Sequence, residues 1–214
     1  MGEFILKKDI NVKYSEMDYD LVLKPASLMQ YMQDLASDSA ESMDFGYSFV
    51  AENNLAWFLL KYHMEFLDYP KGIYDLTLTT EPRGYNRLFA FRDFALFDND
   101  KCIAKMASTW GLVDLENRVM KNAQEALGKN PNIKSFEKRD DDLIYNKIKP
   151  LERVDREKTF EIRFDDLDVN KHANNTNYIV WAFEPLDFDF RSNYKLKTLD
   201  MVFKKEIKYG STIL

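Results

Sequence analysis

Residues 165–178 read DDLDVNKHANNTNY, a polar stretch between the strand-like segment KTFEIRF (158–164) and a helix-like segment through Trp181 and Phe183. Its ten positions from 166 to 175 contain Asp166, Asp168, Asn170, His172, Asn174 and Asn175. Asn174 or Asn175 can cap the helix, and Asp166 can bracket the turn, because short amide and carboxylate side chains favour such positions. These residues therefore have a sufficient structural explanation.

Asp168, Asn170 and His172 invite a chemical explanation. They lie two residues apart, so in an extended segment their side chains would project to the same side. An imidazole can transfer protons near neutral pH, a carboxylate can orient it or activate water, and an amide can hold an oxygen. The following helix N-terminus would offer N–H groups to a developing oxyanion. The residues alone leave a catalytic site and a polar turn equally open.

The first half of the chain predicts a helix packed on a sheet. After an extended segment at 10–14, apolar residues recur at helical spacing from Pro25 to about Met43. Strand-like segments follow at 55–70, 73–82, 87–100 and 101–117, separated by turn signals at 70–72, 82–84 and 98–100. This order predicts an α+β fold in which a helix is wrapped by a long antiparallel sheet.

The second half restarts the same pattern. An offset of 148 residues lays Asp18 and Asp20 on Asp166 and Asp168, and an offset of 141 lays Glu65 on Glu206. The order strand, Asp-x-Asp turn, helix and strand with a central Glu recurs, which indicates an internal duplication. By comparison with the first half, roughly 30 to 40 residues of the second unit would be missing after the final YGSTIL.

The duplication predicts three parts. We expect an N-terminal unit at 1–125, a charged linker at 126–155 and a C-terminal unit at 156–214. The polar segment from 116 to 158, with DDD at 140–142, is interpreted as a solvated connection that contains a short helix and has no binding role.

Composition narrows the class of protein. Of 214 residues 45% are hydrophobic and 31% charged, which is typical of a globular protein. The net charge of −6 disfavours nucleic-acid binding. No apolar run reaches the roughly 18 residues of a membrane span, and the N-terminus lacks signal-peptide features. Two histidines and the single Cys102, expected to be buried and inert, argue against a metal site, and no cofactor is expected. These features favour a cytoplasmic protein.

A longer motif points to a family. The string DLDVNKHANNTNYIVW (166–181) resembles the catalytic motif of the acyl-acyl carrier protein thioesterases of plants and bacteria. The family's pattern, Asp-x-Asn-x-His-x-Asn-Asn-x-x-Tyr, fits without a gap from Asp168 to Tyr178. VFKKEIKYG (202–210) resembles a second segment of the family, in which a Glu lies on the strand that faces the motif. The likeness extends from Tyr14 onward and includes the first helix and the FLLKY strand at 58–62.

The resemblance implies a fold, a reaction and a site. The fold would be a tandem (double) hotdog, and the reaction hydrolysis of the fatty acyl-acyl carrier protein thioester, which releases free fatty acid and ends chain elongation. The catalytic set would be Asp168, Asn170, His172 and Glu206. Plant enzymes often have a Cys after that Glu, where this chain has Ile207, so a Cys–His mechanism is unavailable there.

Two mechanisms stay open. Water can attack with Glu206 or Asp168 as general base while His172 and Asn170 stabilise the thioester oxygen or the leaving thiolate. Alternatively, a carboxylate can attack and form an anhydride.

The first unit has a different predicted role. At the offset of 148, Val22 and Lys24 lie opposite Asn170 and His172, so the imidazole and amide are lost. Such a unit would supply the acyl tunnel, although each candidate residue also suits an ordinary core position. These substrate-binding candidates are Met29, Met32, Ala36, Trp57 and Leu59.

The expected partner is acyl carrier protein. Its acidic surface would need a basic patch, for which the candidates are Lys195, Lys197, Lys204, Lys205 and Lys208. The fold class also serves acyl-CoA thioesterases and could bind lipid without turnover. Both remain alternatives, and the sequence leaves open whether the chain forms a homodimer.

Overall fold

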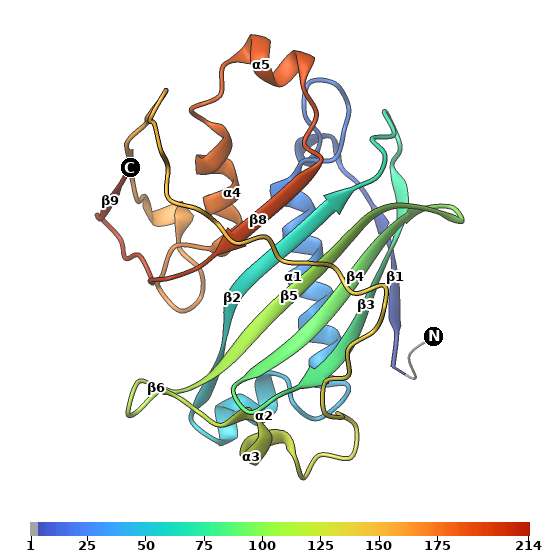
Figure 1. Cartoon of the computed structure of the whole chain (residues 1–214), viewed down its shortest axis with the longest axis vertical. Coiled ribbons are helices and arrows are strands. Elements are labelled where there is room, and N and C mark those ends of the chain that lie inside the picture. The colour runs from blue at the N-terminus through green and yellow to red at the C-terminus, as the bar shows by residue number, and fades with distance from the viewer. Residues whose placement is uncertain (1–3) are drawn as a thin grey trace.

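The computed structural model describes residues 4–214; residues 1–3, at the start of the N-terminal segment considered above, lie outside the described part. One antiparallel sheet dominates it, with strand order β1-β3-β4-β5-β2-β8 and the short β6 paired to β5 (Figure 1). Its strands are β1 (Leu6–Asn11), β2 (Leu55–Phe66), β3 (Asp75–Tyr85), β4 (Phe89–Asp98), β5 (Lys101–Asp114), β6 (Val119–Met120) and β8 (Thr198–Val202). The predicted strand segments 55–70, 87–100 and 101–117 contain β2, β4 and β5, whereas β3 runs three residues beyond its predicted segment 73–82.

Helix α1 (Pro25–Glu41) lies against one face of this sheet (Figure 1). It begins at Pro25, where a missing N–H has no consequence because a helix leaves its first N–H groups unbonded. Its buried residues recur at helical spacing, and Leu28, Met32 and Leu35 pack with side chains of β2 to β5 in the main core. The predicted helix wrapped by a sheet is therefore confirmed, with an end two residues earlier than expected.

One predicted turn lies inside a strand. Pro82, Arg83 and Gly84 form a β-bulge in β3, where the register with β4 shifts between Pro82 and Gly84. Gly84 has φ of 102°, and a Cβ atom there would collide with the carbonyl oxygen of Lys134. A β-bulge, like a turn, favours glycine where φ is positive or where another backbone approaches closely. The glycine at position 84 therefore marks a bulge here, and the turn predicted at 82–84 is wrong.

The second half repeats the element order of the first. The first half has the order β1, the 3₁₀ turn η1 (Tyr14–Glu16), α1, α2 (Tyr47–Glu52), β2 and β3. The second half has the matching order β7 (Phe160–Glu161), the 3₁₀ turn η2 (Phe164–Asp166), α4 (Asn175–Phe183), α5 (Phe188–Asn193), β8 and β9 (Thr212–Ile213). The pairings repeat as well, since β1 pairs with β3 and β7 pairs with β9. This correspondence supports the internal duplication.

Strands β2 and β8 join the two halves into one sheet. They pair antiparallel from Lys61 opposite Val202 to Glu65 opposite Thr198. At their junction His63, 1% exposed, lies 2.7 Å from Asp200 through Nδ1 and 3.1 Å from Glu65 through Nε2. Burial acts to raise the pKa of Asp200, but hydrogen bonds from His63 and Asn146 outweigh it and hold that pKa below its ordinary value. These polar contacts fix the junction.

The charged segment between the units crosses the outer face of the sheet (Figure 1). It contains α3 (Ala123–Leu127), which is the predicted short helix. Arg139 donates to both carboxylate oxygens of Glu81, at 3.0 and 2.6 Å, and Asp142 pairs with the buried Arg83 at 2.6 Å. The segment is therefore docked on the sheet, because its charges find partners there. The expectation of a solvated linker is therefore wrong for residues 139–142, whereas residues 146–159 are exposed as expected.

None of the helices within residues 4–214 combines the length and apolar composition that a bilayer crossing requires. Cys102, expected to be buried, is half-buried in β5. Burial still raises the pKa of its thiol, which disfavours the reactive thiolate.

Candidate active site

One carboxylate fixes the loop before α4. Asp168 Oδ1 accepts the backbone N–H groups of Asn170 (2.8 Å) and His172 (3.1 Å). The backbone N–H of Asp168 donates to the carbonyl of His172 at 2.7 Å, and that of Lys171 to the carbonyl of Asp168 at 3.0 Å. Lys171 has φ of 64°, a left-handed conformation that closes the turn. Asp168 thus determines the backbone path of the residues that carry the amide and the imidazole.

The loop is a tight turn, and the expectation of an extended segment is wrong. Asn170 lies exposed near its tip, whereas the His172 side chain is only 19% exposed. The three side chains therefore do not simply project from one face. Residues of this type make turns as readily as strands, because an Asp side chain can bond N–H groups two residues ahead.

Asp166 and Asn174 support the loop from both ends. Asn174 is the N-cap of α4, and its side-chain oxygen accepts the N–H of Thr176 at 3.0 Å. Asp166 is 2% exposed, and hydrogen bonds from Arg163 hold its pKa below the ordinary value. The structural explanation given for Asp166 is confirmed, and of the two asparagines considered, Asn174 is the cap. Because this cap takes the Thr176 N–H, that group is not free to bind an oxyanion.

Glu206 lies beside His172 although no strand carries it. β8 ends at Val202, so the expected strand setting of Glu206 is wrong. Instead, the backbone N–H of Ala173 donates to the carbonyl of Ile207 at 2.8 Å and draws the two segments together. His172 Nε2 consequently lies 3.3 Å from Glu206 Oε2. The two residues nominated from separate segments are neighbours.

A third residue, Arg118, was missed in the sequence. It lies in the turn between β5 and β6, with φ of 53°, and its Nη2 donates to Glu206 Oε2 at 2.8 Å. The site therefore draws on the first unit as well as the second. Arg118 follows Glu116 and Asn117 in a polar turn, and nothing in that stretch distinguishes it from other surface arginines.

Tyr178 closes the motif on the helix side. Its hydroxyl lies 3.4 Å from the carbonyl of Lys205. Burial, with smaller contributions from the charges of Asp168 and Glu206, raises the pKa of Tyr178, so the phenol stays protonated beside both carboxylates. Within residues 4–214 no group of three or more His, Cys, Asp or Glu side chains is arranged to hold a metal ion.

The five substrate-binding candidates lie in the interior of the first unit. Met29 and Met32 are fully buried, while Leu59 and Ala36 are 5% and 7% exposed, all in the main core. Trp57 is half-buried and donates its indole N–H to the carbonyl of Phe45 at 2.9 Å. None of the five lines any of the four cavities described for residues 4–214.

The first unit has a counterpart of the candidate site at a different offset. Asp18 Oδ1 accepts the N–H groups of Asp20 and Val22, as Asp168 does for Asn170 and His172. The left-handed Leu21 (φ 61°) likewise matches Lys171. The backbones thus correspond at an offset of 150 residues. The alignment at 148 is wrong by two positions, because it matched Asp residues rather than the turn.

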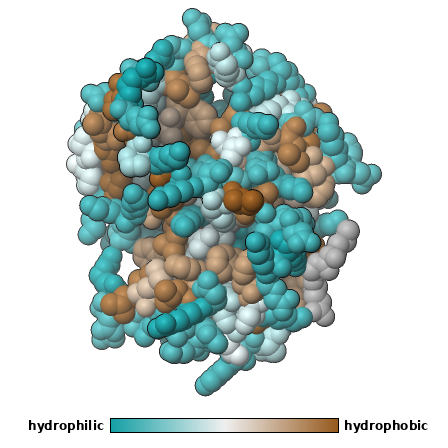
Figure 2. All heavy atoms as spheres, viewed as in Figure 1, coloured by the Kyte–Doolittle hydropathy of each residue, from teal (hydrophilic) through white to brown (hydrophobic). Residues whose placement is uncertain are grey.

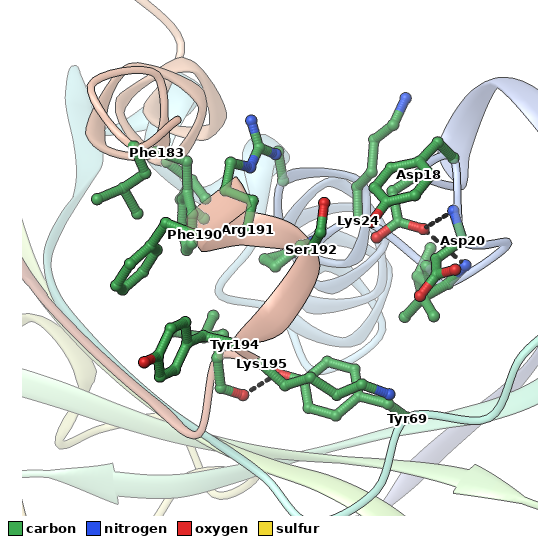
Figure 3. Close-up of a pocket in the computed structure, with 18 of the residues that line it drawn as sticks. Asp18, Asp20, Lys24, Tyr69, Phe183, Phe190, Arg191, Ser192, Tyr194 and Lys195 are labelled. Carbon is green, nitrogen blue, oxygen red and sulfur yellow. Dashed lines mark hydrogen bonds between the residues drawn. The ribbon is translucent and has the colours of Figure 1, made fainter. Parts of the chain in front are cut away.

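At the corrected offset Asp20 takes the place of Asn170, and Val22 takes the place of His172. This turn borders a cavity of about 740 Å³ that is also lined by α4, α5 and residues 194–198 (Figure 3). Neither His172 nor Glu206 lines it. The largest of the described cavities therefore belongs to the turn that lacks the imidazole.

Comparison with known proteins places the chain. Residues 3–129 match the model of the acyl-ACP thioesterase N-terminal domain, where ACP is acyl carrier protein, and residues 149–214 match that of the C-terminal domain. A curated relative, the chloroplastic oleoyl-acyl carrier protein thioesterase of Coriandrum sativum, is 21% identical over 225 residues. That alignment covers 97% of this chain but only 60% of the relative's length.

Solved structures agree in fold. An acyl-ACP thioesterase from Bacteroides thetaiotaomicron superposes with a TM-score of 0.86 at 20% identity, covering 97% of this chain and 84% of the other. The 12:0-ACP thioesterase from Umbellularia californica gives 0.82 at 19% identity, covering 99% and 86%. The expected double hotdog fold is confirmed. The chain therefore belongs to the acyl-ACP thioesterase family.

Proposed function

We propose that this protein hydrolyses the thioester of fatty acyl-ACP, releases free fatty acid and so ends chain elongation. The observation that carries the proposal is the contact between His172 Nε2 and Glu206 Oε2, at 3.3 Å, within a motif that matches this family. An imidazole and a carboxylate in contact can relay a proton, which thioester hydrolysis requires.

In the proposed reaction the oxygen of a water molecule attacks the thioester carbonyl carbon, and Glu206 accepts a proton from that water. The resulting oxyanion receives a hydrogen bond from the exposed amide of Asn170. The proton on Glu206 passes to His172 across their 3.3 Å contact, and His172 delivers it to the leaving thiolate as the C–S bond breaks. Arg118, which donates to Glu206 at 2.8 Å, holds that carboxylate in place. Asp168 acts through the loop, because its Oδ1 is engaged by two backbone N–H groups.

The rival route is attack by the Glu206 carboxylate itself. It would form a mixed anhydride that water then opens. Single-turnover hydrolysis in H₂¹⁸O, followed by mass analysis of the Glu206 peptide, separates the routes. Direct water attack leaves that peptide unlabelled, whereas opening of the anhydride at the enzyme carbonyl labels it.

We further propose that the first unit, predicted as 1–125, holds the acyl chain. Support comes from the apolar interior around α1, where Met29, Met32 and Ala36 face the core with Leu59, and Trp57 lies near the start of β2. Methionine side chains are flexible, so this interior can open for a chain at modest cost. The second unit, 156–214, would then carry the chemistry, with 126–155 as the connection.

For the carrier protein we propose a docking surface beside Glu206. Lys204, Lys205 and Lys208 are exposed and flank that residue. Lys195 and Lys197 are also exposed but lie at the other end of β8, whose five residues span roughly 16 Å at the rise of an extended strand. The five lysines named from the sequence therefore form two groups, of which only the first borders the site.

A substrate panel tests the function. We expect acyl-ACP to be hydrolysed faster than acyl-CoA of equal chain length, and the gap to narrow with salt, because attraction between exposed charges falls within a Debye length of about 8 Å at physiological ionic strength. Preference for CoA at every salt concentration would make the protein an acyl-CoA thioesterase. Saturable binding of both thioesters without turnover would make it an acyl-binding protein.

We also infer a cytoplasmic location, which the single cysteine supports because disulfides are typical of oxidising compartments. A homodimer stays a prediction, for which sedimentation equilibrium is the direct measurement.

A further inference from the structure

The turn between β5 and β6 reaches from the first unit to the candidate site of the second. After β8 the backbone N–H of Phe203 donates to the carbonyl of Leu60 at 2.9 Å, so the chain runs on beside the first half of β2. That half of β2 is paired with the last residues of β5. Glu206 therefore arrives at the β5–β6 turn, which is why Arg118 Nη2 reaches its Oε2 at 2.8 Å.

Arg118 and His172 meet at the same oxygen of Glu206. Arg118 Nη2 lies 2.8 Å from Oε2, and His172 Nε2 lies 3.3 Å from it. Among the contacts described for residues 4–214, none involves Oε1. A glutamate side chain has several rotamers of similar energy, so a donor fixed beside Oε2 selects one of them. Arg118 thereby keeps Oε2 next to the imidazole, where the proposed proton transfer takes place.

Asp114 determines the shape of the turn that carries Arg118. Asp114 is 7% exposed, and its Oδ1 accepts the backbone N–H groups of Glu116 and Asn117, each at 2.9 Å. Its Oδ2 lies 2.9 Å from Lys121 Nζ. These hydrogen bonds, the backbone one from Asn117 first and then that from Lys121, hold the pKa of Asp114 well below its ordinary value. The next residue, Arg118, has φ of 53°, a conformation that a non-glycine residue keeps where its surroundings enforce it.

Packing contributes little to fixing this turn. Val119 and Met120, which form β6, are 53% and 41% exposed. The corner of the molecule that Figure 1 labels β6 shows hydrophobic residues beside hydrophilic ones in Figure 2, as expected of a hairpin end at the surface. The path of the turn therefore depends on Asp114. The second unit uses the same device, since Asp168 also accepts two backbone N–H groups of its own loop.

We propose that Asp114 is a positioning residue for hydrolysis, which acts through Arg118 on Glu206. Asp114 fixes the turn, the turn places the guanidinium, and the guanidinium holds Oε2 beside His172. One aspartate from each unit thus shapes the site, Asp114 on the side of the carboxylate and Asp168 on the side of the imidazole. The inference rests on the proposed function and assigns the first unit a part in the chemical step.

Kinetics of Asp114 variants test the proposal. Asp114→Ala should lower kcat for acyl-ACP about 10 to 10²-fold and change KM by less than about twofold, because a misplaced carboxylate slows the chemical step rather than binding. Asp114→Asn keeps an oxygen that can accept both N–H groups, so its kcat should stay within about threefold of the parent. The matched control is Asp18→Ala, which removes two such bonds from another turn of the first unit. It should lower the melting temperature comparably and leave kcat nearly unchanged.

A double variant separates positioning from general destabilisation. Arg118→Gln should lower kcat about as much as Asp114→Ala, and the two together should be at most about twofold slower than either alone, because both remove the same contact. Arg118→Lys should recover part of kcat, since an ammonium can still form one charge-assisted hydrogen bond to Glu206. Should Asp114→Ala fail to fold, a glycine inserted between Asn117 and Arg118 displaces the guanidinium and should lower kcat likewise. Losses that multiply in the double variant would overturn the proposal.

The histidine ring spectrum gives a readout that needs no turnover. The chain has only two histidines, His63 and His172, so in protein labelled with ¹³C and ¹⁵N at histidine the variant His172→Ala assigns the ring signals. We expect Asp114→Ala and Arg118→Gln to shift the His172 signals in the same direction, and Asp18→Ala to leave them in place. Unchanged His172 signals in Asp114→Ala, or equal kcat losses in Asp114→Ala and Asp18→Ala, would overturn the proposal. A parent protein that gives the expected shifts but hydrolyses neither acyl-ACP nor acyl-CoA would refute only the proposed function.

Discussion

Substitutions of Asp168 distinguish a residue that positions the loop from one that takes part in the reaction. Asp168→Ala removes the acceptor of two backbone N–H groups, at 2.8 and 3.1 Å. A hydrogen bond to a charged group contributes about 1.5–3 kcal/mol net, and partial exposure of Asp168 favours the low end, so we expect a loss of about 3 kcal/mol in the free energy of unfolding. Asp18→Ala removes the same two bonds from the first unit and should cost a similar amount.

Asp168→Asn is the decisive companion variant. Its amide oxygen can accept both N–H groups, so we expect the free energy of unfolding to fall by less than about 1 kcal/mol. The assays are urea unfolding and the rate of acyl-ACP hydrolysis under single-turnover conditions. We predict that Asp168→Ala reduces this rate about 10²-fold, because a displaced loop misplaces the imidazole, whereas Asp168→Asn stays within about tenfold of the parent. An Asp168→Asn protein of normal stability that is as inactive as Asp168→Ala would refute the positioning role and make the carboxylate a reacting group.

Other predictions follow from particular side chains. Cys102→Ser should keep the parent rate of hydrolysis, since the half-buried thiol lies outside the candidate site; a lost rate at unchanged melting temperature would contradict this. Ala36→Phe should shift the measured chain-length profile toward shorter acyl groups, several-fold per carbon, because each excluded methylene forfeits about 0.8 kcal/mol; an unchanged profile would argue against a chain lying beside α1. Asp200 has a lowered pKa, so its charge stabilises the fold above the ordinary value near 4 and that stability is lost as pH falls through the folded-state value. Asp200→Asn should therefore reduce the free energy of unfolding, on the order of 1 kcal/mol, in urea at pH 7 and by much less at pH 3. Lys204→Glu with Lys205→Glu should raise KM for acyl-ACP while leaving KM for acyl-CoA nearly unchanged.

Periodicity predicted the elements that bury a full face. The apolar spacing around Leu28, Met32 and Leu35 defined α1, and alternation defined β2 to β5, because both patterns report a core that many contacts enforce. The short β7 escaped the same reasoning: KTFEIRF alternates over seven residues, yet only Phe160–Glu161 pairs, with β9. Pairing depends on a partner strand, which local sequence does not reveal.

The residues of the candidate site could be predicted where they lie in one continuous motif, but not where folding brings distant segments together. Asp168, Asn170 and His172 lie within one stretch, whereas Arg118 reaches Glu206 from 88 residues away. The offset between the two halves failed for a related reason. Matching Asp residues suggested an offset of 148 residues, but the left-handed turns at Leu21 and Lys171 establish an offset of 150. Residue type alone does not determine this backbone conformation.

In the proposed function His172, paired with Glu206, carries thioester hydrolysis. The most direct test is kcat/KM for acyl-ACP in His172→Ala, with the melting temperature measured on the same preparation. General acid–base groups contribute about 10² to 10⁴ in rate, so we predict a fall of that size at an unchanged melting temperature. A folded His172→Ala protein with near-parent kcat/KM would contradict the assignment.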